Sequence, residues 1–347
     1  MATLWFCLLA LMIAMYVVFD GFDLGVGVVH LFTARTDEDR RRAVAAIGPF
    51  WDGNEVWLLA TGGVLYFAFP AVYARSFSGF YLPLMLVLWL LILRALALEL
   101  RGAVAHPLWT ALWDRCFGLA SLLLAVFFGA ALGNVVRGVP LGRDGRFFEP
   151  LWTHFRTSGA TGVLDWYTLL AGGTAAVALA VHGALWLAVR TEGEPHDRAR
   201  RLALRLWAPL GVVVALLTWA TIEVQPQVSA QLVGRPWGFA FPALAVAGFL
   251  GIRRFARRGR PARAFLASCL LLAGLVASAA FGIYPYLLPS NGGAGPGLSV
   301  HDTAAPRYGL GVGLAWWSVG MALVAVYFAV LYRRFGGKVR LEDAAHY

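Results

Sequence analysis

The chain has 347 residues, of which 60% are hydrophobic and 14% charged, and its formal net charge is +10. Globular domains carry about 25% charged residues, and apolar runs of about 20 residues recur along this whole sequence, which excludes a soluble fold. The arginines gather in short loops between the apolar runs, a distribution typical of membrane orientation rather than of nucleic-acid binding. The three cysteines lie in or beside apolar segments without metal-ligand spacing, and they read as packing residues.

The apolar runs predict nine membrane-spanning helices. Their approximate ranges are 3–32, 47–70, 77–101, 115–137, 164–189, 205–223, 237–253, 264–288 and 308–332. When the N-terminus is placed outside, the arginine-rich loops and the basic C-terminal tail all fall on the cytoplasmic side. We therefore expect an all-α, multi-pass protein of the bacterial cytoplasmic membrane, with a periplasmic N-terminus and a cytoplasmic C-terminus. The first segment lacks a basic n-region and a small-residue cleavage site, so it is expected to be a retained helix.

A weak internal repeat of about 155–160 residues, in which Pro49 recurs as Pro209 and Pro70 as Pro226, predicts two pseudo-repeated halves. The expected parts are a first four-helix bundle over 1–137, an external loop over 138–163, a second four-helix bundle over 164–288, an external loop over 289–307, and a peripheral ninth helix with a cytoplasmic tail over 308–347. The second half has no counterpart of the acidic residues described next, so their function belongs to the first bundle.

Two motifs place carboxylates in otherwise apolar segments. One contains Asp20 and Asp23. The other contains Asp52, which directly follows Trp51, and Glu55 three residues later. A charged side chain near the middle of a membrane helix costs about 2.5–3.5 kcal/mol on insertion scales, so such acids are functional candidates. A set of structural ion pairs between helices is the alternative reading for any single acid.

Further ionisable groups accompany the two motifs. His30 lies on the helix face of the first motif, Arg94 lies inside the third predicted span, and Glu99 and Arg101 lie near the cytoplasmic end of that span. All of these groups fall in the cytoplasmic half of one bundle, which is the arrangement of a proton path that enters from the cytoplasm without crossing the membrane. We expect one acid to pair with Arg94 and another to remain free to exchange protons, with Glu99 and Arg101 in structural pairs.

Other kinds of site are less well supported. No phosphate-binding loop, nucleophile triad or metal-ligand cluster is evident in the sequence. Only His30 and His182 fall within predicted spans, so a haem held by two histidines between the bundles is an alternative. Hydrogen-bonded packing is the more common role of a histidine in a membrane helix, and we favour that reading.

The motifs also resemble subunit II of cytochrome bd-type quinol oxidases. The similar stretches are Phe19-Asp-Gly-Phe-Asp-Leu-Gly-Val-Gly, Ile47-Gly-Pro-Phe-Trp-Asp-Gly-Asn-Glu-Val-Trp-Leu, Phe69-Pro-Ala-Val-Tyr, Ser78-Gly-Phe-Tyr-Leu-Pro, the segment from Arg94 to Glu99 with Arg101, Gly133-Asn134 with Gly138-Val-Pro, His182-Gly-Ala and Tyr284-Pro-Tyr-Leu-Leu-Pro-Ser. The resemblance runs the length of the chain and is densest over 16–101.

The resemblance implies a partner, subunit I, with the same fold, which would ligate haems b558, b595 and d and carry out quinol oxidation and oxygen reduction. This chain would ligate no haem and no metal. Asp20, Asp23 and Asp52 would occupy a cytoplasmic proton path toward the haem d site. A quinone or lipid bound as a structural element, and a small single-helix accessory subunit, are further partners compatible with the family.

Two other functions fit some of the same features. A proton-coupled secondary transporter would use internal repeats and intramembrane carboxylates, but the acids of the first bundle stop in its cytoplasmic half. A structural scaffold would make every acid an ion-pair anchor, and neutral substitutions would then impair assembly rather than turnover.

Overall fold

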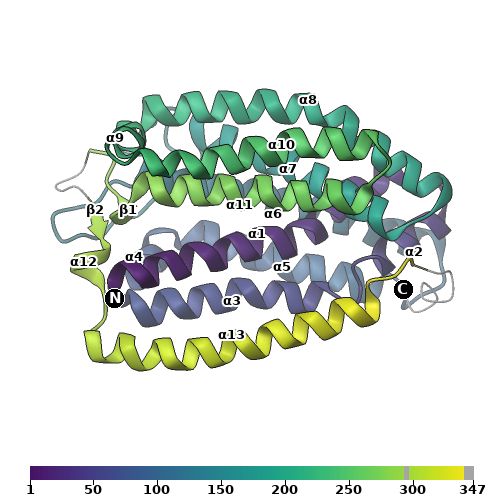
Figure 1. The fold of residues 1–347 in the computed structure, drawn as a ribbon, viewed down its shortest axis with the longest axis horizontal. Helices are drawn as coiled ribbons and strands as arrows, with labels where there is room; N and C mark the ends of the chain where they lie inside the picture. Colours follow the sequence, from purple (N-terminus) through teal and green to yellow (C-terminus); the bar gives the residue numbers. More distant parts are fainter. Residues whose placement is uncertain (293–296, 340–347) are drawn as a thin grey trace.

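The computed structural model describes residues 1–292 and 297–339, and the chain folds into a bundle of long helices (Figure 1). Within these described residues, eight helical segments are long and apolar enough to cross a membrane. They are α1 (Ala2–Thr33), α5 (Tyr81–Leu100), α6 (Pro107–Arg137), α7 (Trp166–Arg190), α8 (Gly193–Val224), the segment Pro236–Arg257 formed by the short 3-10 helix η1 (Pro236–Phe239) and α10 (Ala240–Arg257), α11 (Pro261–Ile283) and α13 (Arg307–Phe335). A helical membrane protein is therefore established.

The predicted second span corresponds to α3 (Trp51–Ala68), which is helical but is not among the eight apolar segments. Its first turns carry the polar residues Asp52, Asn54 and Glu55. The count of nine spans, the internal repeat and the membrane orientation remain predictions.

Several boundaries differ from the predicted ones, and a proline begins three of the helices concerned. Helix α6 begins at Pro107, where the preceding His106 side chain accepts a hydrogen bond from the backbone N–H of Leu108. Pro70 likewise opens the separate short helix α4 (Pro70–Gly79) between the second and third predicted spans. The stretch after the sixth span forms α9 (Pro226–Gly234), and α8 itself begins at Gly193, well before the predicted start. Proline suits the first helical position because its missing N–H would be unsatisfied there anyway.

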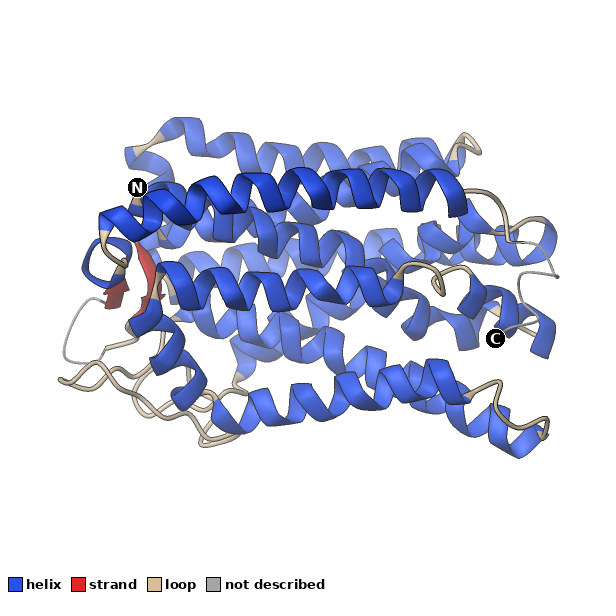
Figure 2. Ribbon diagram, turned by 90° about the horizontal axis from the view of Figure 1, so that it is seen from below, coloured by secondary structure: helices blue, strands red, loops and turns tan. Residues whose placement is uncertain are grey.

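Helix α1 lies inside the bundle and contacts α3, α6, α7 and α11. The bundle has two ends, which we name by their elements (Figures 1 and 2). The α2 end carries the short helix α2 (Asp37–Ala45), and the hairpin end carries the strands β1 (Tyr286–Pro289) and β2 (Gly297–Ser299). Helix α1 begins at the hairpin end, and α13 ends at the α2 end. The α2 end is the one that the sequence predicts to be cytoplasmic.

Helices α1 and α7 cross with their backbones in contact at two glycines. A Cβ atom on Gly25 would lie 2.0 Å from the backbone oxygen of Leu179, and a Cβ on Gly183 would lie 2.1 Å from the backbone carbon of Gly25. Small residues permit such close helix approach inside membranes. The crossing joins the two predicted halves of the chain.

The hairpin end is more regular than the sequence predicts. Strand β1 pairs antiparallel with β2, with Leu288 opposite Leu298, and the four-residue helix α12 (Val300–Thr303) follows. A parallel bridge between Val139 and Ser290 ties the first external loop to the hairpin. Residues 293–296 of the second predicted external loop, and 340–347 of the predicted tail, lie outside the described residues.

Candidate functional site

The buried charges of the first motif meet Arg94 of α5 in the interior of the bundle. The Asp20 carboxylate accepts two hydrogen bonds from this guanidinium, at 2.6 Å from Nη2 and 3.1 Å from Nη1. Asp23, one turn further along α1, has Oδ2 at 4.0 Å from Arg94 Nη2. All three side chains are completely buried. This bidentate geometry is the strongest arrangement for an arginine and a carboxylate.

Helix α3 completes the group with two side chains. The amide nitrogen of Asn54 donates to Asp23 Oδ2 at 2.7 Å and to the backbone oxygen of Phe19 at 3.3 Å. Glu55 lies with Oε2 at 4.0 Å from Arg94 Nη1, and its side chain is 26% exposed. We call Asp20, Asp23, Asn54, Glu55 and Arg94 the buried acid group. Asn54 was not predicted to belong to the site; the available signal was an amide between the two carboxylates of the second acidic motif.

Three predicted site residues lie near the buried acid group along the chain but are not part of it. Asp52 is exposed on the first turn of α3, one turn from Glu55 toward the α2 end, and Trp51 beside it is half-buried against the apolar core. His30 is buried on α1, where its Nδ1 bonds the backbone oxygen of Gly27 at 2.7 Å. The series from Asp52 through Glu55 to Asp23 therefore runs from an exposed to a fully buried carboxyl.

The remaining two predicted ion-pair residues lie elsewhere. Glu99 is exposed near the end of α5. Arg101 forms a second cluster at the α2 end, where its Nε donates to Asp114 Oδ1 at 2.6 Å and its Nη2 to Asp37 Oδ1 at 2.8 Å. This cluster links α2 to the end of α5 and to the first turns of α6. It is separate from the buried acid group.

A third charged cluster, at the hairpin end, escaped sequence analysis. Arg137 ends α6 and pairs with Asp165, the N-cap of α7, and with Glu149 of the loop 138–163, whose Oε1 lies 2.6 Å from Arg137 Nη2. Thr161 also donates to Glu149, and Asn134 accepts from Arg137. Burial raises the pKa of Glu149 to about 6, against the lowering effect of Arg137. The two acidic partners of Arg137 lie 12 and 28 residues further along the chain, so spacing in the sequence did not indicate these ion pairs.

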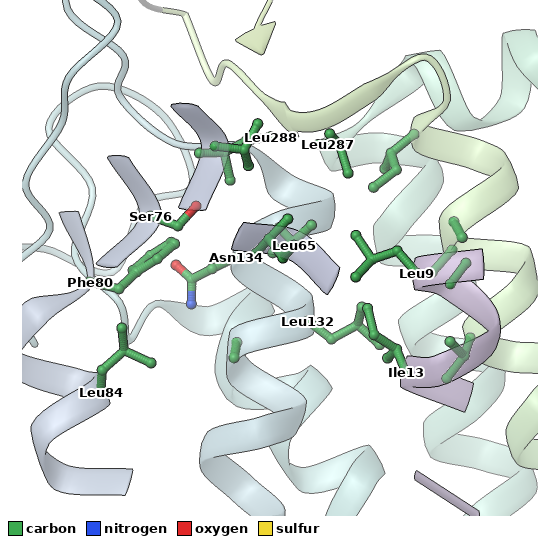
Figure 3. Close-up of a pocket in the computed structure, with 18 of the residues that line it drawn as sticks. Leu9, Ile13, Leu65, Ser76, Phe80, Leu84, Leu132, Asn134, Leu287 and Leu288 are labelled. Carbon is green, nitrogen blue, oxygen red and sulfur yellow. The ribbon is translucent and has the colours of Figure 1, made fainter. Parts of the chain in front are cut away.

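An apolar cavity of about 250 Å³ lies in the half of the bundle nearer the hairpin end, where residues from the start of α1 and from β1 line it (Figure 3). Its walls come from α1, α3, α4, α5, α6, α11 and β1, and include Leu9, Leu65, Phe80, Leu132 and Leu288. Ser76 and Asn134 are the polar side chains labelled on its wall in Figure 3. The cavity is chemically suited to a hydrocarbon chain.

The two histidines within predicted spans differ in their hydrogen bonds. His30 uses only Nδ1, and its Nε2 is buried without a hydrogen-bond partner among the described residues. His182 of α7 uses both ring nitrogens, Nδ1 to Ser268 Oγ at 2.7 Å and Nε2 to the backbone oxygen of Val18 at 2.9 Å. A ring nitrogen that holds a hydrogen bond in this way is not available as an axial ligand. Over the described ranges, no group of three or more His, Cys, Asp or Glu residues is placed to hold a metal ion.

Comparison with known proteins shows which family the chain belongs to. Residues 1–335 match the family described as cytochrome bd terminal oxidase subunit II. The chain belongs to that family. It is 32% identical to cytochrome bd-I ubiquinol oxidase subunit 2 of Escherichia coli K12 over 98% of this chain and 95% of that protein. It is 36% identical to cytochrome bd ubiquinol oxidase subunit 2 of Bacillus subtilis over 63% of this chain and 62% of that protein.

The fold agrees with the family. A solved structure of the bd oxidase from Geobacillus thermodenitrificans superimposes with a TM-score of 0.73, covering 96% of this chain and 98% of the matched chain, at 18% sequence identity. This subunit II is therefore a component of an oxidoreductase complex, as the resemblance predicted. The transporter reading has no such support.

Proposed function

We propose that this chain is the haem-free subunit of a quinol:oxygen oxidoreductase of the bacterial cytoplasmic membrane, and that it supplies protons from the cytoplasmic side toward a haem-bearing subunit I. The haems b558, b595 and d would all lie in that partner. The family membership and the names of the relatives support the quinol oxidase reading. The engaged ring nitrogens of His182 are consistent with a chain that does not ligate haem.

One observation carries the proton-path proposal, namely the graded burial of the acids. Asp52 is exposed, Glu55 is partly exposed, and Asp23 and Asp20 are fully buried beside Arg94. Chains of carboxylates that lead inward from one surface are typical of proton relays in membrane proteins. In this proposal Asp52 takes a proton at the α2 end, Glu55 and Asp23 pass it inward, and Asp20 borders the path where it pairs with Arg94. His30 and Trp51 would border the path, while Arg101 would hold the neighbouring helix ends.

The apolar cavity provides a place for the structural quinone or lipid that the family resemblance suggests. Its lining is almost entirely hydrocarbon, with Ser76 on the wall to meet a polar head group. Asn134, the other polar side chain there, is already hydrogen-bonded to Arg137 and to the backbone. A single-helix accessory subunit remains compatible with the exposed apolar faces of the outer helices, for example Trp219 of α8 and Trp316 of α13.

The test begins with mild-detergent purification of this subunit from its native membrane. A co-purifying partner of similar size with b- and d-type absorption bands supports the complex, and a colourless protein without a partner contradicts it. In the purified complex, Asp52→Asn should lower oxygen consumption with quinol while the haem spectrum stays unchanged. Loss of haem together with the subunit would instead support a scaffold.

A further inference from the structure

The two buried acids on α1 are held in very different ways. Both oxygens of Asp20 accept hydrogen bonds from the guanidinium of Arg94. Asp23 is 4.0 Å from the same guanidinium and accepts one hydrogen bond, from the neutral amide of Asn54. Its second oxygen, Oδ1, is buried without a hydrogen-bond partner among the described residues. An ionised carboxylate can accept about four hydrogen bonds, so this environment solvates the charge of Asp23 poorly.

The charge count of the fully buried residues leads to the same conclusion. Arg94 contributes one positive charge, and Asp20 neutralises it with a bidentate pair. A second negative charge on Asp23 would have no cation of its own within the part of the group that is completely buried. Two like charges that share one site favour protonation of one of them. The hydrogen bonds single out Asp23 as the acid that carries the proton.

The orientation of Asn54 fits this assignment. Its nitrogen donates to Asp23 Oδ2 and to the backbone oxygen of Phe19, and the second bond fixes the amide orientation because a backbone oxygen can only accept. The amide oxygen, Asn54 Oδ1, is buried and lacks a partner, as does Asp23 Oδ1. A proton on Asp23 changes one of these two unsatisfied acceptors into a donor, which an ionised carboxylate cannot provide.

We infer that Asp23 holds a proton in the resting protein, that Asn54 is its positioning residue, and that Asp20 is the fixed counter-ion of Arg94 rather than a proton carrier. This deepens the proposed function, on which its biological meaning rests, because it names the acid that stores the proton. The protonation itself is a property of the resting protein and can be measured without turnover.

The measurement is the infrared absorption of the purified complex at pH 8, where Glu149 is ionised, in H₂O and in D₂O. The wild-type spectrum minus that of Asp23→Asn should contain the carbonyl band of a protonated carboxylic acid, and the band should shift in D₂O. Asn54→Leu, which keeps the size of the side chain but removes the donor to Asp23, should move this band without abolishing it. Asp114→Asn is the matched control, because Asp114 is a buried carboxylate paired with Arg101, and its removal should leave the band unchanged.

The outcomes separate this inference from the proposed path. Absence of the band from the wild-type difference spectrum, or an unmoved band in Asn54→Leu, would overturn the inference. Where Asp23→Asn does not accumulate, Asn54→Leu alone decides, because Asn54 bonds Asp23 and does not bond Asp20 in the described structure. An Asp23→Asn complex that loses the band but consumes oxygen at the wild-type rate would support the protonation and remove Asp23 from the path.

Discussion

Replacing Arg94 by alanine tests the central ion pair most directly. The side chains of Arg94 and Asp20 are both 0% exposed, and the guanidinium makes two hydrogen bonds to the carboxylate. Removing one partner of a buried pair costs about 3–5 kcal/mol, because the remaining charge is left without compensation. The whole stability of a folded domain is about 5–15 kcal/mol. We therefore expect Arg94→Ala to reduce strongly the amount of subunit II in the membrane and the midpoint temperature of its thermal unfolding.

The control is an exposed pair of the same residue types. Arg42 and Glu38 form an i,i+4 pair at 2.5 Å on α2, with side chains 26% and 51% exposed. Such pairs contribute about 0.3–0.5 kcal/mol, so Arg42→Ala should change neither measurement appreciably. The double variant Arg94→Ala with Asp20→Asn should be more stable than Arg94→Ala alone, since the stranded carboxylate is gone.

The assay is immunoblotting of membranes together with thermal unfolding of the purified complex, followed by tryptophan fluorescence. If Arg94→Ala accumulates and unfolds like the wild type, or if Asp20→Asn gives no recovery in the double variant, the pair does not stabilise the bundle and the reasoning fails.

Three further predictions concern other parts of the chain. Asp52→Asn should slow oxygen consumption and proton uptake without altering the haem bands, and unchanged rates in both assays would exclude it from the path. The pKa of Glu149 rises from 4.5 to about 6 on folding, so the free energy of unfolding should fall by about 2 kcal/mol as pH rises from 4 to 7. Glu149→Gln should flatten this pH dependence in thermal unfolding. An equal pH dependence in both proteins would contradict the role of burial. Gly25→Ala should destabilise the α1–α7 crossing, because its Cβ would meet the oxygen of Leu179 at 2.0 Å. Gly62→Ala is the control, since a Cβ there would have open space around it. Similar thermal unfolding of the two variants would refute the close contact.

The acidic motifs could be recognised from the sequence because charge is rare in an apolar helix. Helical spacing placed Asp20 and Asp23 on one face, and depth within the predicted spans placed Arg94 at a similar level. The sequence could not tell which acid Arg94 meets, because that depends on how α1 and α5 rotate against each other. Asn54 was passed over for a similar reason, since an amide beside carboxylates acquires its role only from the α1–α3 contact.

The cluster at the hairpin end was beyond sequence reasoning. The sequence gives Arg137 no partner, whereas the structure buries it between Glu149 and Asp165. These partners come from a loop and from the start of the next helix, so no helical or strand period links them. The hairpin of β1 and β2 was missed because its strands have four and three residues, which is too short for an alternating pattern to be visible.

The glycine crossing of α1 and α7 has a consequence for how this segment can change in length. Gly25 fixes the rotation of α1 against α7, and the acids that face Arg94 lie only two and five residues before it. With 3.6 residues per turn, one inserted or deleted residue between Asp23 and Gly25 would turn both carboxylates by about 100° relative to the crossing. A conservative substitution between Asp23 and Gly25 can keep this geometry, but an insertion or deletion cannot. The number of residues between the acids and the glycine is therefore fixed by geometry, even at positions where the residue type is not.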